Sequence, residues 1–312
     1  EADRVGFQIM GGAGFDTTGM VAFFQRMQAA TRVYSDSMPA YLRSHPLTIE
    51  RISDIQARIR QTPKQARPDS MDFHLVRARA RVLQDETAAG LAATETTFRS
   101  QIAGEGRAEQ AAAQYGMALI ALRRGQLASA QEWLDKARDG IKPRARIGVY
   151  SAAPPVLGDG ESVYTALALD IKLAPKQPAA IAQQGLKEAE LAHARFPLSR
   201  GIARQYADAM IVNGKLDEAA RFLRDQVQLY REEPKLHELL AKTYAAQGKV
   251  ALQHLSLAES YALAGGLMGA LDQLALARKA KDASFYDLAI IDARERELQA
   301  RHREELKEKK EE

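Results

Sequence analysis

A spacing of 34 residues between two glycines constrains this chain more than any other feature of its sequence. Gly214 and Gly248 each separate two segments rich in helix-forming residues. Small and larger hydrophobic residues recur at matching places around them, namely Ala207, Met210, Ala219 and Leu223 around the first glycine and Ala241, Tyr244 and Leu257 around the second. Self-similarity at this period predicts stacked helix–turn–helix units rather than one globular core.

Two further segments follow the same pattern. One places its turn at Gly125, with Ala118, Ala121, Ala130, Leu134 and Ala137 around it; the other places its turn at Gly265, with Ala270, Leu274 and Ala277 after it. The pattern resembles the tetratricopeptide repeat, whose small residues let two antiparallel helices approach closely. Gly265 lies half a period after Gly248, so we expect the helix at about residues 251–264 to pack on both of its neighbours. An all-helical bundle without regular repeats is the alternative.

Helix-forming residues also dominate the rest of the chain, and strand-like alternation is scarce. We therefore expect an all-α fold. The segment "RQTPKQARPDS" (residues 60–70) holds two prolines and several cationic residues with little to bury, which is typical of a linker. This linker divides the chain into residues 1–66 and a repeat domain at residues 67–312. Mixed charges over residues 294–312 predict a solvated helix.

Composition excludes several classes of protein. No apolar run approaches the roughly 18 to 20 residues that would span a bilayer. The net charge is only +4, basic and acidic residues are interleaved, and aromatic residues make up 6% of the chain, which argues against a nucleic-acid partner. Absence of cysteine excludes disulfides and thiolate metal sites. That absence fits an oxidising compartment such as the periplasm and fits a cytosol nearly as well.

The N-terminal segment carries two short motifs. The first motif begins with an acid followed by Ala2, Asp3 and Arg4, and it continues through Gly6 into an apolar helix that ends near "GGAGFD". The second motif is the loop "SHPL" (residues 44–47), which precedes Arg51 and Ile52. Together these motifs resemble the gluzincin zinc metallopeptidases of bacteria that are related to the CAAX prenyl proteases. Some members carry a tetratricopeptide domain after the peptidase domain. The resemblance therefore spans the whole chain and implies remnant helices of such a peptidase followed by an α-solenoid.

The resemblance implies roles for two residues. A catalytic zinc takes two histidines and one carboxylate from the protein and keeps water in an open position. Asp3 matches the Asp of the family's Glu-x-x-x-Asp motif, in which Glu is the third ligand; it would orient a histidine ligand or donate a proton. His45 matches a histidine that can occupy the open zinc position and hold the enzyme shut. The alternatives are an ordinary first-turn acid for Asp3 and a surface or hydrogen-bonded histidine for His45. We expect Arg4 and Arg51 to be surface charges rather than partners of carboxylates around the site.

One departure from the family is plain: none of the six histidines belongs to a His-Glu-x-x-His motif. The position that matches the ligand Glu falls before Glu1. We therefore expect residues 1–66 to be the C-terminal remnant of a zinc metallopeptidase domain and the 312-residue chain to be inactive by itself. The resemblance implies a periplasmic endopeptidase that acts in outer-membrane protein quality control, with repeats that bind protein substrates or the assembly machinery. Peripheral association with the membrane is compatible with that role. A non-catalytic tetratricopeptide scaffold is the alternative.

Overall fold

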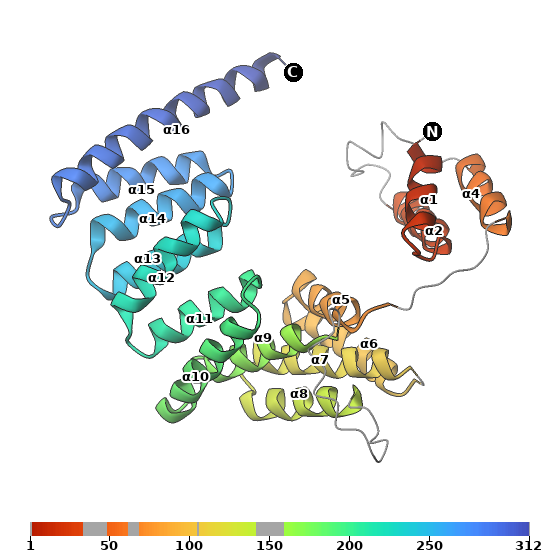
Figure 1. Cartoon of the computed structure of the whole chain (residues 1–312). Helices are drawn as coiled ribbons and strands as arrows, with labels where there is room; N and C mark the ends of the chain where they lie inside the picture. Colours follow the sequence, from red (N-terminus) through yellow and green to blue (C-terminus); the bar gives the residue numbers. More distant parts are fainter. Residues whose placement is uncertain (1, 34–48, 62–68, 105, 142–158, 312) are drawn as a thin grey trace. The chain divides into compact units, whose positions relative to one another are not determined.

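The computed structural model describes residues 2–33, 49–61, 69–104, 106–141 and 159–311, and every regular element within these ranges is an α-helix (Figure 1). The expected all-α fold is therefore confirmed. The chain divides into two compact units, Glu1–Asp69 and Ser70–Glu312. The loop that contains His45 and most of the expected linker lie outside the described residues.

The first unit contains α1 (Ala2–Gly12), α2 (Thr18–Val33) and α4 (Ile49–Gln61). Helix α1 ends because Gly14 adopts φ +77°, which lets the Phe15 amide donate to the Met10 carbonyl at 3.0 Å. Asp16 then accepts a hydrogen bond from the Thr18 amide at 2.9 Å, an Asx-turn that leads the chain into α2. The small core of this unit consists of Phe7, Phe24, Ile52 and Ile55.

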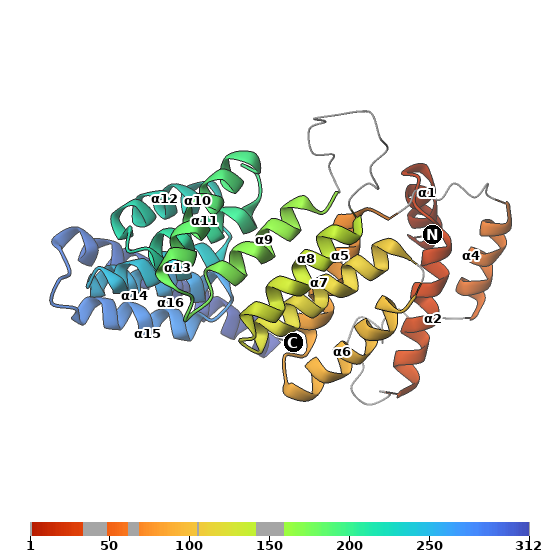
Figure 2. The same ribbon diagram turned by 90° about the horizontal axis from the view of Figure 1, so that it is seen from below.

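The second unit contains twelve helices within the described ranges. They are α5 (Met71–Gln84), α6 (Ala88–Ile102), α7 (Arg107–Arg123), α8 (Leu127–Ile141), α9 (Glu161–Lys172), α10 (Ala179–Arg195), α11 (Arg200–Val212), α12 (Leu216–Leu229), α13 (Pro234–Ala246), α14 (Val250–Leu263), α15 (Leu267–Lys279) and α16 (Phe285–Glu311). From α7 onward, each helix packs against the next along the chain (Figure 2). Helix α14 packs against both α13 and α15, as its half-period spacing predicts.

Glycine recurs at the turns because the backbone there requires a positive φ. Gly125, Gly214, Gly248 and Gly265 adopt φ between +72° and +82°. At each turn the residue after the glycine donates its amide to the carbonyl five residues earlier, as Lys215 does to Met210 at 2.9 Å. A side chain in this left-handed conformation costs about 1–2 kcal/mol, so glycine terminates each helix at the same point of the pattern.

Small residues are buried at matching places after the turns. Five residues after three of the turn glycines stand Ala130, Ala219 and Ala270, all fully buried. The fourth turn has Gln253 at this position, and α14 buries Ala251, Ala258 and Ala262 in its place. Short side chains at these positions allow the helix axes to approach and exclude water between them.

The C-terminal helix differs from the expectation of a solvated tail. Leu298 is 1% exposed and belongs with Ile291 to a core cluster formed with α14 and α15. Arg294 also donates to Glu259 of α14 at 2.7 and 2.8 Å. A spacing of seven residues between the two apolar side chains keeps them on one helix face, although charged neighbours dominate the local composition. The first half of α16 is therefore a packed helix.

Candidate functional site

Asp3 and Arg51 meet in the first unit although 48 residues separate them in the sequence. Asp3 lies in the first turn of α1, and Arg51 lies near the start of α4. The Arg51 Nε donates to Asp3 Oδ2 at 2.6 Å, and its Nη2 donates to Asp3 Oδ1 at 2.8 Å. This two-point arrangement is the strongest geometry for an arginine–carboxylate pair, and it fixes both oxygens of Asp3.

The pair lies at the edge of the small core. The Arg51 guanidinium stands 5.3 Å from the centre of the Phe24 ring, and the side chains of Arg51 and Asp3 are 32% and 23% exposed. The expectation that Arg51 is merely a surface charge is therefore wrong, because its planar donor group pairs with Asp3 and covers an aromatic ring. Arg4 is more exposed, at 53%, but it too pairs with a carboxylate of this unit, since its Nε lies 3.5 Å from Asp54 Oδ2.

Arg51 also stabilises the ionised form of its partner. Its hydrogen bonds lower the pKa of Asp3 below the ordinary value, and burial opposes this only in part. Asp3 is therefore an ionised hydrogen-bond acceptor at neutral pH. Of the two roles considered from the sequence, this electrostatic environment suits an orienting carboxylate better than a proton donor.

The described residues do not form a zinc site. In the described ranges, no three side chains of His, Asp, Glu or Cys are grouped so that they could hold a metal ion. The described part of the first unit contains no histidine, and the proposed ligand His45 lies outside it. Both oxygens of Asp3 also accept a hydrogen bond from the Arg51 guanidinium, whose positive charge disfavours a metal cation beside them. The donor set on α1, α2 and α4 therefore does not fit a catalytic zinc.

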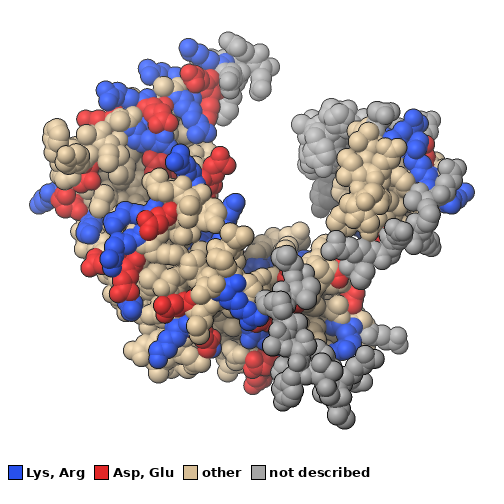
Figure 3. Space-filling model, in the orientation of Figure 1, with Lys and Arg blue, Asp and Glu red and all other residues tan. Residues whose placement is uncertain are grey.

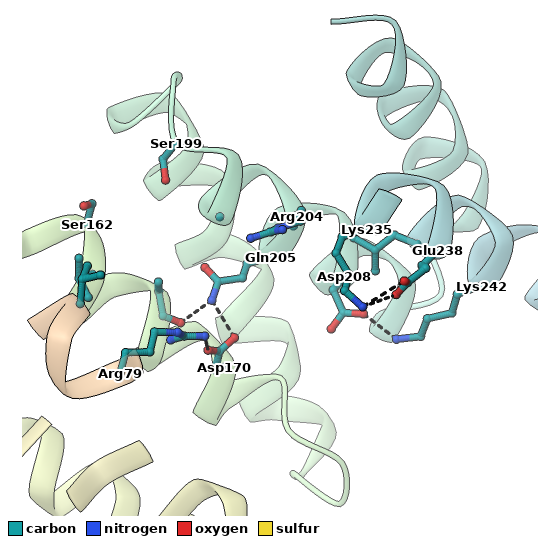
Figure 4. A pocket seen from close by; sticks show the side chains of 15 residues that line it. Arg79, Ser162, Asp170, Ser199, Arg204, Gln205, Asp208, Lys235, Glu238 and Lys242 are labelled. Atoms are coloured by element: carbon teal, nitrogen blue, oxygen red, sulfur yellow. Dashed lines mark hydrogen bonds and ion pairs between the residues drawn. The ribbon is translucent and has the colours of Figure 1, made fainter. Parts of the chain in front are cut away.

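The second unit contains a cavity of about 760 Å³, which we call the inner groove. It is lined from α5, α9, α11 and α13, and its lining includes Arg79, Ala166, Asp170, Gln205, Asp208 and Leu239 (Figure 4). Sequence reasoning identified the helices but none of these residues as a site. Each of the four helices contributes only a few side chains, so no local motif marks the groove.

A hydrogen-bonded network spans the middle of the inner groove. Arg79 donates to the hydroxyl of buried Tyr115 at 3.2 Å and to Asp170 at 3.4 Å. Gln205 donates through Nε2 to Asp170 at 2.7 Å and to the Ala166 carbonyl at 2.5 Å. These bonds join α5, α7, α9 and α11 in one polar cluster. The network holds the polar side chains in the middle of the groove in fixed positions, beside apolar lining residues such as Val163 and Leu239.

Comparison with known proteins relates both units to one group. Residues 1–59 match the model of Peptidase family M48. The chain is 30% identical over 294 residues to the Beta-barrel assembly-enhancing protease of Escherichia coli (strain K12), which covers 94% of this chain and 55% of that protein. The Yersinia pestis protein of the same name is 31% identical over 297 residues, with the same coverage.

A shorter match, 42% identical over 79 residues, relates the chain to the Putative beta-barrel assembly-enhancing protease of Vibrio cholerae; it covers 25% of this chain and 16% of that protein. The chain thus spans about half the length of the two longer-matching relatives. In the part of the chain that the structure describes, no helix has the length and apolar character needed to cross a membrane.

Proposed function

We propose that this chain is the C-terminal part of a periplasmic, zinc-dependent endopeptidase that acts in outer-membrane protein quality control. Residues 1–66 would be the remnant of the peptidase domain, and residues 67–312 would be tetratricopeptide repeats that bind protein substrates or assembly partners. The observation that carries this proposal is the similarity to the two assembly-enhancing proteases, because it covers 94% of the chain and includes the segment that matches the peptidase family.

The proposal gives Asp3 and His45 different roles. Asp3 would be an ionised carboxylate, held in place by Arg51, that orients a histidine of the catalytic centre. His45 would be a metal ligand that competes with water and substrate for the open position, so that the resting enzyme is latent. Arg51 would act through Asp3, since it donates a hydrogen bond to each oxygen of that carboxylate.

The test uses the longer protein that contains this chain. Asp3→Asn should lower cleavage of an unfolded protein substrate without loss of zinc, because the substitution keeps the shape of the side chain and removes its charge. His45→Ala should raise cleavage while zinc stays bound through the remaining ligands. Zinc content is measured by elemental analysis in parallel with the rate, so that loss of metal is distinguished from loss of orientation.

The isolated 312-residue chain provides the control. It should neither cleave casein nor bind one equivalent of zinc, because one imidazole cannot replace three protein ligands. Proteolysis by this chain that a chelator abolishes would contradict the assignment of residues 1–66 as a remnant. If His45→Ala in the longer protein loses activity but keeps its metal, the latch role is wrong.

A second candidate function is a non-catalytic interaction scaffold. The observation that favours it is the inner groove, which lies entirely in the repeat-bearing unit and contains its own polar network. A longer protein that binds unfolded substrates but shows no chelator-sensitive cleavage would support this function over the peptidase.

A further inference from the structure

A second, smaller cavity of about 240 Å³ lies among α8, α9 and α10, and we call it the α8–α10 cavity. Arg138 of α8 and Lys172 of α9 line it together with Glu188, Leu191 and Arg195 of α10. The three residues of α10 lie three and four positions apart, so they share one face of that helix. The described linings of this cavity and of the inner groove have no residue in common, so the two are separate features.

Positive charge predominates in the α8–α10 cavity. Over the second unit, the face seen in Figure 3 shows basic and acidic side chains interspersed. The described lining of the cavity instead contains three cations, Arg138, Lys172 and Arg195, and one carboxylate, Glu188. Glu188 accepts hydrogen bonds from Lys172 and, at 2.9 Å, from Gln184. Within the described lining, no carboxylate is therefore left for the two arginines.

Both arginines are held against aromatic rings. The Arg138 guanidinium stands 5.9 Å from the centre of the Tyr164 ring, and that of Arg195 stands 5.2 Å from the centre of the Phe196 ring. A contact of this kind restrains a guanidinium and leaves its N–H donors for oxygen atoms. The two charged groups are thus positioned without using the hydrogen bonds that would bind an anion.

Arg138 also keeps a buried donor without a partner. Its Nε is buried, and no residue that the structure describes accepts a hydrogen bond from it. Buried polar atoms are normally satisfied. Arg195 is only weakly engaged, since its Nη1 lies 3.8 Å from Glu161 and its side chain is 50% exposed. An added anion can therefore bind both guanidinium groups without breaking a strong ion pair within the protein.

The size and the charge of the cavity favour phosphate over other anions. Pockets that enclose drug-sized ligands measure about 300–1,000 Å³, so this cavity suits a single small group. A phosphate monoester carries about two negative charges and three strong acceptor oxygens. These match two guanidinium groups, which bind phosphate oxygens in pairs, better than the single charge of a carboxylate does. Leu191 lines the same cavity with a side chain that is 71% exposed, so it can cover an apolar part of the ligand.

We propose that the α8–α10 cavity binds a dianionic phosphate group, which accepts hydrogen bonds from Arg138 and Arg195. Lys172 adds positive charge from its place beside Glu188. Inorganic phosphate and the headgroup of a phosphorylated lipid offer the same chemistry, and the exposed Leu191 allows the two to be distinguished. This inference goes beyond the proposed function, because neither peptide cleavage nor the binding of protein partners requires an anion in this cavity.

Four substitutions test the site. Arg138→Gln and Arg195→Gln each remove one guanidinium and keep a polar side chain, and Leu191→Ser removes the exposed apolar group. Arg224→Gln is the matched control, because Arg224 is an exposed arginine of α12 that does not line the cavity.

The assay is isothermal titration calorimetry with the 312-residue chain at pH 8 and constant ionic strength. The probes are inorganic phosphate, dihexanoyl phosphatidic acid below its critical micelle concentration, and acetate. We expect both phosphate compounds to bind at one site per chain and acetate to bind at least about tenfold more weakly. Arg138→Gln and Arg195→Gln should each weaken phosphate binding about tenfold, whereas Arg224→Gln should leave it within about twofold.

Leu191→Ser separates the two sources of the phosphate group. If a lipid is the ligand, phosphatidic acid binds at least about tenfold more tightly than inorganic phosphate, and Leu191→Ser removes most of this difference while the affinity for inorganic phosphate stays the same. Equal affinities of the two compounds, unchanged in Leu191→Ser, assign the site to free phosphate.

Three results would overturn the proposal: no binding of either phosphate compound, acetate that binds as tightly as phosphate, or full phosphate affinity in both arginine variants. If Arg138→Gln lowers the melting temperature of the chain, Arg195→Gln decides the question, because it alters a half-exposed side chain. Each of these results leaves the peptidase proposal standing, which fails only if the longer protein has no chelator-sensitive activity.

Discussion

Replacing either member of the Asp3–Arg51 pair is expected to loosen α1 from α4. The pair makes two charge-assisted hydrogen bonds, and its side chains are between one fifth and one third exposed. Fully exposed pairs contribute about 0–1 kcal/mol, whereas breaking a buried pair costs about 3–5 kcal/mol. For this intermediate exposure we expect Arg51→Gln and Asp3→Asn each to destabilise the first unit by about 1–2 kcal/mol.

The two substitutions should not be additive. Once one partner is gone, removal of the other loses no further hydrogen bond between them, so the double variant should be only slightly less stable than either single variant. The double-mutant cycle should then give a coupling free energy of about 1–2 kcal/mol. Arg60→Gln is the control within the same helix, because Arg60 is exposed and lies in the last turn of α4, far along the helix from Arg51.

The pH dependence provides an independent check of the same pair. Because Arg51 lowers the pKa of Asp3 in the folded state, the stabilisation is fully present above the unfolded pKa, about 3.9, and is lost as the pH falls through the lower folded value. The difference in stability between the unmodified chain and Arg51→Gln should therefore be constant from pH 5 to pH 8. It should shrink only in more acidic solution.

Hydrogen exchange measured by mass spectrometry can follow the first unit alone. Peptides from α1 and α4 report its local opening at pH 7, and fluorescence of Trp133, the only tryptophan and part of α8, reports whether the second unit is unchanged. Pulse proteolysis with pepsin extends the comparison to pH 3. Two results would refute the electrostatic account of this pair. One is that the two single substitutions lower the free energy of unfolding in a strictly additive way. The other is that Arg51→Gln lowers it as much at pH 3 as at pH 7.

Two further substitutions test the packing of the second unit. Ala219→Glu places an unpaired charge at a fully buried position of α12 and should lower the melting temperature of the second unit by more than about 10 °C in circular dichroism. Gln228→Glu, on the exposed side of the same helix, should leave the melting temperature unchanged. Gly160→Ala should cost about 1–3 kcal/mol in urea unfolding, because Gly160 has φ +82° and its β-carbon would lie 2.7 Å from Leu75; Gly201→Ala, in open helical surroundings, should be neutral or stabilising.

The helical turns of the second unit could be predicted because their cause is local. Gly214 and Gly248 each need a left-handed backbone, and the requirement repeats with the period of the chain. The buried Ala219 and Leu223 follow from the same turn by counting along one helix face. Residues whose environment is set within one helix pair were therefore accessible to sequence reasoning.

The sites were harder to predict because they depend on contacts between distant elements. Both Asp3 and Arg51 belong to motifs noticed in the sequence, but nothing in those motifs indicates that the two side chains meet. The groove residues Arg79 and Gln205 come from helices far apart in the chain, and they become neighbours only through Asp170. The burial of Leu298 was missed because charged residues dominate the surrounding sequence, although a single apolar residue among them can still complete a core.

The position of α14 between two equivalent turns has a consequence for how this array can lengthen. Gly248 and Gly265 end consecutive helices with the same backbone geometry, so α14 serves as the second helix of one pair and the first helix of the next. At this point the array can grow or shrink by a single helix rather than by a pair. A one-helix change reverses the direction in which the chain leaves the stack. Whether the number of helices is odd or even, rather than the number of helix pairs, therefore decides at which edge of the stack the following segment emerges.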